Sequence, residues 1–161
     1  MREKDHDSEN WLDPWVDQFS DSLVAYAYVL TQDYHAAQDV TQETFVRLYT
    51  FCRRHPDRDI VPGWLYTTLR RQVLTTLRRR REWVDLDAGH MAVSDTPVWL
   101  PALFRDTLLK LPRADRECLW LFYYNDWTTE QIARHLGLSP GAVRGRLMRA
   151  RQRLRAMWEA D

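Results

Sequence analysis

The stretch that most restricts the fold of this chain lies near its end, at residues 127–151. Thr128 and Gln131 have the spacing of a capping box, which predicts the start of a short helix. Gly137 can take the left-handed conformation that ends a helix, and Ser139 is a typical cap for the helix that follows. Two short helices joined by so tight a turn form a helix-turn-helix.

The second helix combines an apolar stripe with many arginines. Val143, Leu147 and Ala150 recur at helical spacing and are expected to face the core. Residues 131–155 contain seven Arg and no Asp or Glu. We expect the six arginines of residues 144–155 to share the side away from the core, without an acidic partner. Such a helix is typical of proteins that read DNA.

The position of each arginine suggests what it contacts. Arg144 and Arg146 lie near the start of the second helix, next to its cap Ser139, and suit base edges. Arg149, Arg151, Arg153 and Arg155 lie further along and suit phosphates. The candidate contacts with double-stranded DNA are Ser139, Arg144, Arg146, Arg149 and Arg151.

The charges are unevenly distributed along a chain whose net charge is zero. Residues 1–60 contain 6 basic and 12 acidic side chains, whereas residues 101–161 contain 11 and 7. An acidic front and a basic back indicate two partners, one of them a nucleic acid. Cys52 and Cys118 stand alone without a secretory leader, which favours a reduced, cytoplasmic setting. No run approaches the roughly 18 apolar residues of a membrane span.

Hydrophobic spacing predicts an all-α fold made of two small helical domains. Helical spacing recurs at residues 11–30, 34–51 and 62–81, and Asp33 is suited to cap the second of these helices. They are assigned to an N-terminal domain, residues 11–82. Residues 83–101 lack a clear period and are expected to form a flexible linker. Residues 102–158 then form a four-helix domain that ends in the helix-turn-helix.

The usual patterns of catalytic and metal sites are missing from the sequence. Cys52 and His55 have a ligand-like gap, but no second pair lies near them. There is no glycine-rich phosphate loop, nucleophile elbow or pair of catalytic carboxylates. We therefore expect no enzyme activity, no metal, no cofactor and no small-molecule substrate.

Three sequence blocks together resemble a bacterial sigma factor of the small, extracytoplasmic-function type. They are Asp39-Val-Thr-Gln-Glu-Thr-Phe-Val-Arg-Leu-Tyr49, Trp64-Leu-Tyr66, and the helix-turn-helix with the residues leading to it from Leu111. The resemblance covers most of the chain outside residues 1–10 and the linker. It implies a protein that binds core RNA polymerase, carries it to promoters and helps to open the duplex.

The resemblance also implies roles for particular residues. Asp39, Gln42 and Glu43 match the family's polymerase-binding helix. The helix from Ser139 matches the reader of the distal promoter element, and the linker would thread the polymerase's RNA exit path. The loop 52–61 and the helix from Trp64 match the part that captures the melted non-template strand. In that helix the candidate contacts are Trp64, Arg70, Arg71, Arg78 and Arg79.

One departure from the family pattern bears on melting. The family usually has Asn and Asp on the outer face of the third helix, where this chain has Arg71 and Thr75. An inhibitor or scaffold that occupies polymerase without supporting initiation is therefore one alternative. Another is a stand-alone regulator that binds operator DNA as a dimer. By analogy with the family, we also expect an anti-sigma partner, in some members membrane-bound.

Overall fold

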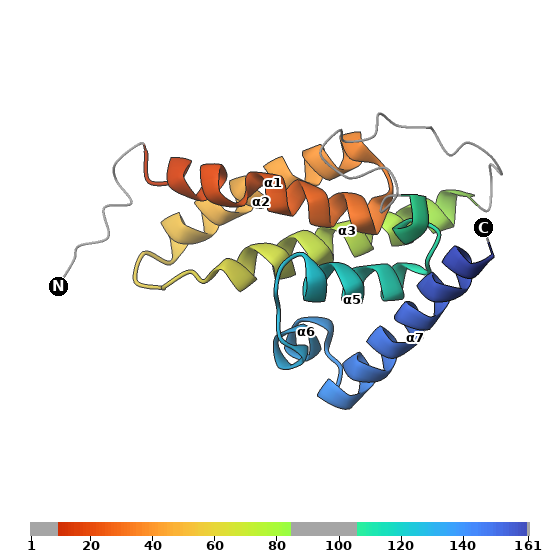
Figure 1. The fold of residues 1–161 in the computed structure, drawn as a ribbon. Helices are drawn as coiled ribbons and strands as arrows, with labels where there is room; N and C mark the ends of the chain where they lie inside the picture. The colour runs from red at the N-terminus through yellow and green to blue at the C-terminus, as the bar shows by residue number, and fades with distance from the viewer. Residues whose placement is uncertain (1–9, 85–105, 161) are drawn as a thin grey trace. The chain divides into compact units, whose positions relative to one another are not determined.

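The computed structural model describes residues 10–84 and 106–160, with residues 81–84 described by their backbone only. Every regular element in these ranges is an α-helix, which confirms the predicted all-α fold. The helices are α1 (Asp13–Thr31), α2 (Tyr34–Arg54), α3 (Pro62–Val84), α5 (Arg113–Tyr123), α6 (Thr129–Leu136) and α7 (Pro140–Glu159) (Figure 1). The chain divides into two compact units, residues 1–92 and 93–161, called the N-terminal and C-terminal units below.

The predicted linker, residues 83–101, is described only at its first two positions, where α3 continues to Val84. The rest of it lies outside the described residues. Of the four helices predicted for residues 102–158, the first lies partly outside the described residues, which contain a helical turn over residues 106–108 before α5. The predicted domain boundaries at 82 and 102 therefore stay predictions.

Two neighbouring residues make the turn between α1 and α2. Gln32 takes a left-handed conformation, with φ 56°, and its N–H donates to the carbonyl of Tyr28 at 2.8 Å. Asp33 then caps α2, as predicted, because its Oδ1 accepts a hydrogen bond from the N–H of Ala36 at 3.0 Å. The chain reverses within these two residues, so α1 and α2 pack against each other along their length.

The N-terminal unit is a three-helix arrangement in which α1, α2 and α3 each contact the other two (Figure 1). Its most deeply buried side chains are Leu23, Tyr26, Val29, Leu48, Leu65, Leu69 and Val73. Thr44, also buried, donates to the carbonyl of Val40 at 2.7 Å and accepts from Nε2 of Gln72 at 3.0 Å. Because this hydroxyl is satisfied on both sides, α2 and α3 can pack closely around it.

The C-terminal unit packs α5 against α6 and α7, and α6 against α7. Its most deeply buried side chains are Leu108, Leu111, Leu121, Ile132, Val143 and Leu147. Arg116 is also buried, and its Nη1 donates to the carbonyl oxygens of Leu111 at 2.9 Å and Leu109 at 3.4 Å. This side chain therefore joins the turn before α5 to the helix itself.

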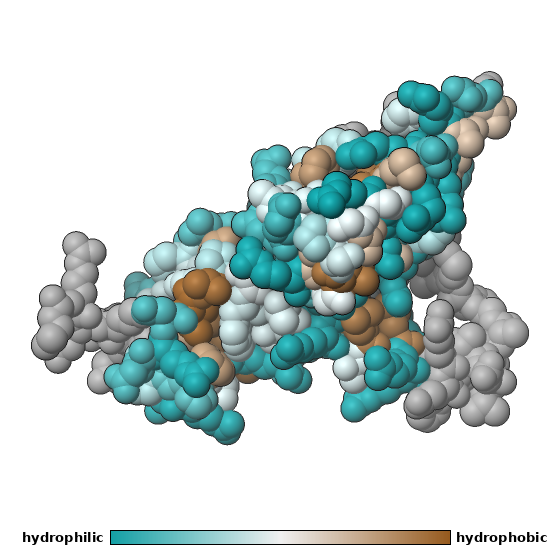
Figure 2. Space-filling model, turned by 90° about the horizontal axis from the view of Figure 1, so that it is seen from below, coloured by the Kyte–Doolittle hydropathy of each residue, from teal (hydrophilic) through white to brown (hydrophobic). Residues whose placement is uncertain are grey.

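The face of the molecule drawn in Figure 2 is mostly hydrophilic. On the face drawn in Figure 2, hydrophobic residues of the described ranges form small patches between hydrophilic ones. Among the residues whose side chains are described, the large apolar ones with more than half of their surface exposed are Val46, Val61, Tyr123, Met148 and Trp158. Scattered residues of this kind are normal on a monomer, so polar and charged groups are the first place to look for a binding site.

Candidate nucleic-acid interface

The helix-turn-helix consists of α6 and α7, and its predicted caps are confirmed. The Thr128 hydroxyl accepts from the N–H of Gln131 at 3.1 Å, and Oε1 of Gln131 accepts from the N–H of Thr128 at 2.9 Å. Gly137 ends α6 with φ 68°. The Ser139 hydroxyl accepts from the N–H of Ala142 at 3.1 Å and caps α7. These short-range bonds fix the angle at which α7 leaves the turn.

The apolar stripe of α7 faces the core as expected. Val143, Leu147 and Ala150 are buried, and from α6 Ile132 and Ala133 are buried with them. Since the stripe occupies one side of α7, the arginines of this helix lie on its other sides. Arg144, Arg149 and Arg155 are exposed along the helix, where phosphates and base edges can reach them.

Arg146, the second residue expected at base edges, is half-buried. Its guanidinium lies near the buried thiol of Cys118 in α5 and acts to lower the pKa of that thiol. It is therefore less available to DNA than Arg144, which lies two residues earlier and is exposed.

The expectation that the arginines of α7 have no acidic partner is wrong for Arg153. Its Nη1 forms an ion pair with Oδ2 of Asp115, a carboxylate in α5 that is almost completely buried. The two residues are 38 positions apart in the chain, so no pattern along α7 could reveal the pair. Arg153 thus holds α7 against α5 and compensates a buried charge.

Arg151 is exposed but held at one side by aromatic residues of α5. Its Nε donates to the hydroxyl of Tyr123 at 2.7 Å. Its guanidinium carbon lies 5.6 Å from the ring centre of Phe122 and 5.5 Å from that of Tyr123, within the range of cation–π contact. Sequence reasoning placed Arg151 at the DNA surface and did not identify Tyr123.

The thiol of Cys118 is buried beneath α7 and has an altered pKa. Burial raises its pKa from 9.0 to about 11, although the nearby Arg146 guanidinium acts in the opposite direction. Burial disfavours the thiolate because the charged form loses its hydration. At neutral pH Cys118 is therefore an inert part of the core.

This pKa gives a pH prediction for the C-terminal unit. The folded state keeps the Cys118 proton up to about pH 11, whereas the unfolded chain loses it near pH 9. The free energy of unfolding therefore has its full value below pH 9 and decreases between pH 9 and 11. The decrease is at most about 1.4 kcal/mol for each pH unit. Urea unfolding at pH 8, 9 and 10 should show this fall, and Cys118→Ala should reduce it. A fall of equal size in both proteins would contradict the assignment.

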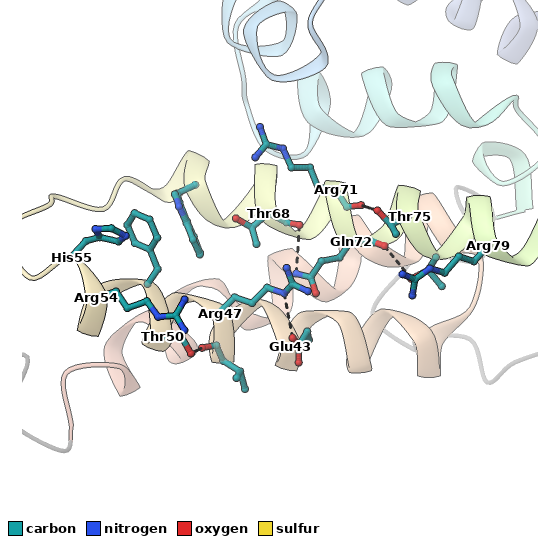
Figure 3. Close-up of a pocket in the computed structure, with 14 residues that line it drawn as sticks. Glu43, Arg47, Thr50, Arg54, His55, Thr68, Arg71, Gln72, Thr75 and Arg79 are labelled. Atoms are coloured by element: carbon teal, nitrogen blue, oxygen red, sulfur yellow. Dashed lines mark hydrogen bonds and ion pairs between the residues drawn. The ribbon is translucent and has the colours of Figure 1, made fainter.

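The N-terminal unit carries a groove between α2 and α3 with a volume of about 880 Å³ (Figure 3). Four arginines line it, two from each helix: Arg47, Arg54, Arg71 and Arg79. Thr75 also lines it and donates to the carbonyl of Arg71 at 2.8 Å. Of the two residues that depart from the family pattern, Arg71 thus places its guanidinium in a groove with those of three other arginines.

An aromatic cluster lies at the end of the groove near the loop that joins α2 to α3. Trp64 is half-buried, and its ring centre lies 5.2 Å from that of Phe51, which in turn lies 4.6 Å from the ring of His55. All three residues line the groove. Aromatic faces beside arginines suit a single-stranded nucleic acid, whose bases stack while its phosphates meet the cations.

The other two candidate arginines of α3 are outside the groove lining. Arg70 is half-buried, and Arg78 is exposed near the end of the helix. The structure therefore brings together Trp64, Arg71 and Arg79 but not the whole predicted set. Arg47 of α2 was missed, because only the packing of α2 beside α3 brings it into the same groove as Arg71 and Arg79. Arg54 falls within the predicted loop 52–61, but the first three residues of that loop belong to α2, which ends at Arg54.

The predicted polymerase contacts lie on α2, where Asp39, Gln42 and Glu43 are all exposed. Glu43 accepts a charge-assisted hydrogen bond from Nε of Arg47 at 3.2 Å, one turn further along the helix. Both side chains are more than half exposed, so this pair adds little to stability. Because Glu43 also lines the groove, it belongs to both surfaces of α2.

The described residues contain neither a metal-site cluster nor a membrane-spanning helix. Within residues 10–84 and 106–160, no group of three or more His, Cys, Asp and Glu side chains could hold a metal ion. In the same ranges, no helix has the length and apolar character needed to cross a lipid bilayer.

Two known families match separate parts of the chain. Residues 15–82 match Sigma-70 region 2, and residues 102–154 match Sigma-70, region 4. The ECF RNA polymerase sigma factor EcfG of Rhodopseudomonas palustris is 32% identical over 146 residues, which cover 87% of this chain and 81% of the relative. The ECF sigma factor SigL of Mycobacterium tuberculosis is 32% identical over 152 residues, covering 86% and 84%.

Solved structures agree with the sequence relatives. The sigma factor RpoE of Bartonella quintana, in complex with the anti-sigma factor NepR, superposes with a TM-score of 0.78 and 25% identity. The match covers 94% of this chain and 99% of that one. CnrH in complex with the cytosolic domain of CnrY gives a TM-score of 0.68 with 26% identity, covering 97% and 93%.

Proposed function

The chain belongs to the extracytoplasmic-function sigma factors, and we propose that its two units carry different parts of promoter recognition. Members of this family bind core RNA polymerase and direct it to specific promoters, and this is the function of the chain. The observation that carries the proposal is that a region 2 match and a region 4 match occur in one chain, each over one compact unit.

In the N-terminal unit, the exposed face of α2 with Asp39, Gln42 and Glu43 binds core polymerase. The groove beside it takes the promoter at its melted edge, with Arg71 and Arg79 on phosphates and the aromatic cluster near bases. The charge and the rings that line the groove support this assignment. Arg70 and Arg78 extend the basic surface of α3 beyond the groove.

In the C-terminal unit, α7 reads the distal promoter element as double-stranded DNA. Arg144 is its base-reading residue, because it is exposed in the first turns of the helix after the Ser139 cap. Arg149, Arg151 and Arg155 contact phosphates. Arg146 contributes less than Arg144 because it is half-buried beside Cys118.

Run-off transcription tests the function directly. Purified core polymerase is supplied with a library of promoter fragments, with and without the protein, and specific transcripts are expected only when the protein is present. Polymerase that binds the protein but stays silent would support an inhibitor or scaffold instead. A footprint on DNA without polymerase, at paired half-sites, would support a stand-alone dimeric regulator.

We also propose an anti-sigma partner and a cytoplasmic location. Both solved relatives described above are in complex with a partner, NepR for RpoE and the cytosolic domain of CnrY for CnrH. Copurification of a tagged chain from cells of its source, before and after stress, tests this partner. The chain itself performs no catalytic step in this scheme, since the polymerase forms the phosphodiester bonds.

The role of Arg144 leads to a prediction about specificity. Arg144→Ala should reduce discrimination between the preferred and random distal elements by about 1–3 kcal/mol, because a bidentate contact with a base is lost. Arg155→Ala is the matched control on the same helix. It should weaken binding to both DNAs alike and lower the slope of log affinity against log salt by about one unit. Fluorescence binding assays with the polymerase complex measure both, and equal losses on the two DNAs for Arg144→Ala would exclude base reading by this residue.

A further inference from the structure

Tyr123 and Arg151 form a contact between the end of α5 and the middle of α7. The Nε of Arg151 donates to the Tyr123 hydroxyl at 2.7 Å, and the rings of Phe122 and Tyr123 lie within 5.6 Å of its guanidinium carbon. One hydrogen bond and two ring contacts thus restrict a side chain that otherwise has four rotatable bonds. Arg151 is exposed, and so is Tyr123 with 53% of its surface accessible. This contact therefore does little for the core, and its role must be sought at the surface.

Arg151 lies in the row of α7 that contains the base-reading residue. With 3.6 residues per turn, positions 7 and 11 residues after Arg144 return to nearly the same side of the helix. Arg144, Arg151 and Arg155 therefore form one exposed row along one flank of the apolar stripe. A guanidinium has five donors, and Tyr123 takes only the one on Nε. The remaining donors on the two Nη atoms suit a phosphate of the same DNA, about 10 Å further along α7 than Arg144.

We propose that Tyr123 is a positioning residue, which orders the Arg151 guanidinium so that it meets a phosphate of the distal promoter element. This inference rests on the proposed phosphate contact of Arg151. Ordering a long side chain on binding costs affinity, and an arginine already held by α5 avoids much of that cost. Tyr123 thus acts on DNA affinity through Arg151, from a helix outside the helix-turn-helix.

A double-mutant cycle tests this on the polymerase complex bound to a promoter fragment selected by run-off transcription. Tyr123→Phe removes the hydroxyl and keeps the ring, and it should weaken binding about two- to tenfold without changing the salt slope. Arg151→Gln should weaken binding and lower the salt slope by about one unit. In the Arg151→Gln background, Tyr123→Phe should have no further effect, because the group that it positions is gone.

The matched control is Tyr124→Phe, the same change at the next residue, whose ring stacks on Trp120 with centres 4.3 Å apart. It should leave DNA affinity unchanged, and urea unfolding of each variant checks that the fold is kept. If Arg151→Gln alters neither affinity nor salt slope, the proposed DNA contact of Arg151 is wrong. If Arg151→Gln weakens binding while Tyr123→Phe is neutral, or adds its full effect to that of Arg151→Gln, the positioning role alone is overturned.

Discussion

Replacing Arg116 with methionine should destabilise the C-terminal unit by about 2–4 kcal/mol. The guanidinium donates to the carbonyls of Leu111 and Leu109, which join the turn before α5 to the helix. Methionine fills a similar volume but donates no hydrogen bond, so both carbonyls lose this donor in a poorly hydrated place. The unit has a small core, and a loss of this size is a large part of the stability of such a domain.

Arg116 is buried as a cation, and the cost of burying this charge limits the destabilisation expected from its replacement. Burial, and to a smaller extent the nearby Arg113, lower the pKa of Arg116 to about 10 against the opposing effect of Glu117, so the ion is partly desolvated in the folded state. Methionine relieves that cost, which is why the expected loss is not larger. Hydrogen exchange followed by peptide mass spectrometry should show faster exchange across α5, α6 and α7 but not across α1, α2 and α3.

Arg113→Met is the matched control for this change. Arg113 lies in the first turn of the same helix and is exposed, so its replacement should leave exchange in the C-terminal unit nearly unchanged. If the two variants exchange alike, the hydrogen bonds of Arg116 contribute no more than a surface residue does.

Reversing the charge at Asp39 should weaken binding to core polymerase by about tenfold or more, because like charges facing each other across an interface cost several kcal/mol. Asp39 is exposed on α2, so Asp39→Arg should leave the free energy of unfolding nearly unchanged. Competition for fluorescently labelled polymerase measures the affinity. Asp39 is a cleaner probe than Glu43, whose carboxylate is paired with Arg47 and also lines the groove.

Asp17→Arg provides the control with the same change in net charge. Asp17 is exposed on α1 rather than on α2. Its reversal should leave polymerase affinity within about twofold at physiological salt, where exposed charges are screened beyond about 8 Å. Equal losses for the two variants would indicate a general effect of charge and would remove Asp39 from the interface.

The sequence was sufficient for the helix caps, which depend on neighbours in the chain. The capping box at Thr128, the left-handed Gly137 and the caps at Asp33 and Ser139 are all confirmed. Each depends on bonds that span two or three residues, so local chemistry decides it. The apolar spacing of α7 likewise identified its buried side, because helical geometry repeats along the sequence.

The sequence was insufficient where two helices meet. The pair Arg153–Asp115 and the contact Arg151–Tyr123 join residues 38 and 28 positions apart, and the groove depends on α2 lying beside α3. One error was nevertheless avoidable. At about 100° per residue, the arginines of α7 fall in two rows on opposite flanks of the apolar stripe, so they do not share one side.

The two cysteines of the chain make it suitable for distance measurements in solution. Cys52 and Cys118 are both almost completely buried, and the raised pKa of Cys118 leaves its thiol protonated at the pH of maleimide labelling. Cysteines introduced at exposed positions of each unit, such as Asp17 and Ala156, should therefore accept a donor and an acceptor dye without modification of the native thiols. Energy transfer between the dyes then reports the separation of the two units, in the free protein and on polymerase.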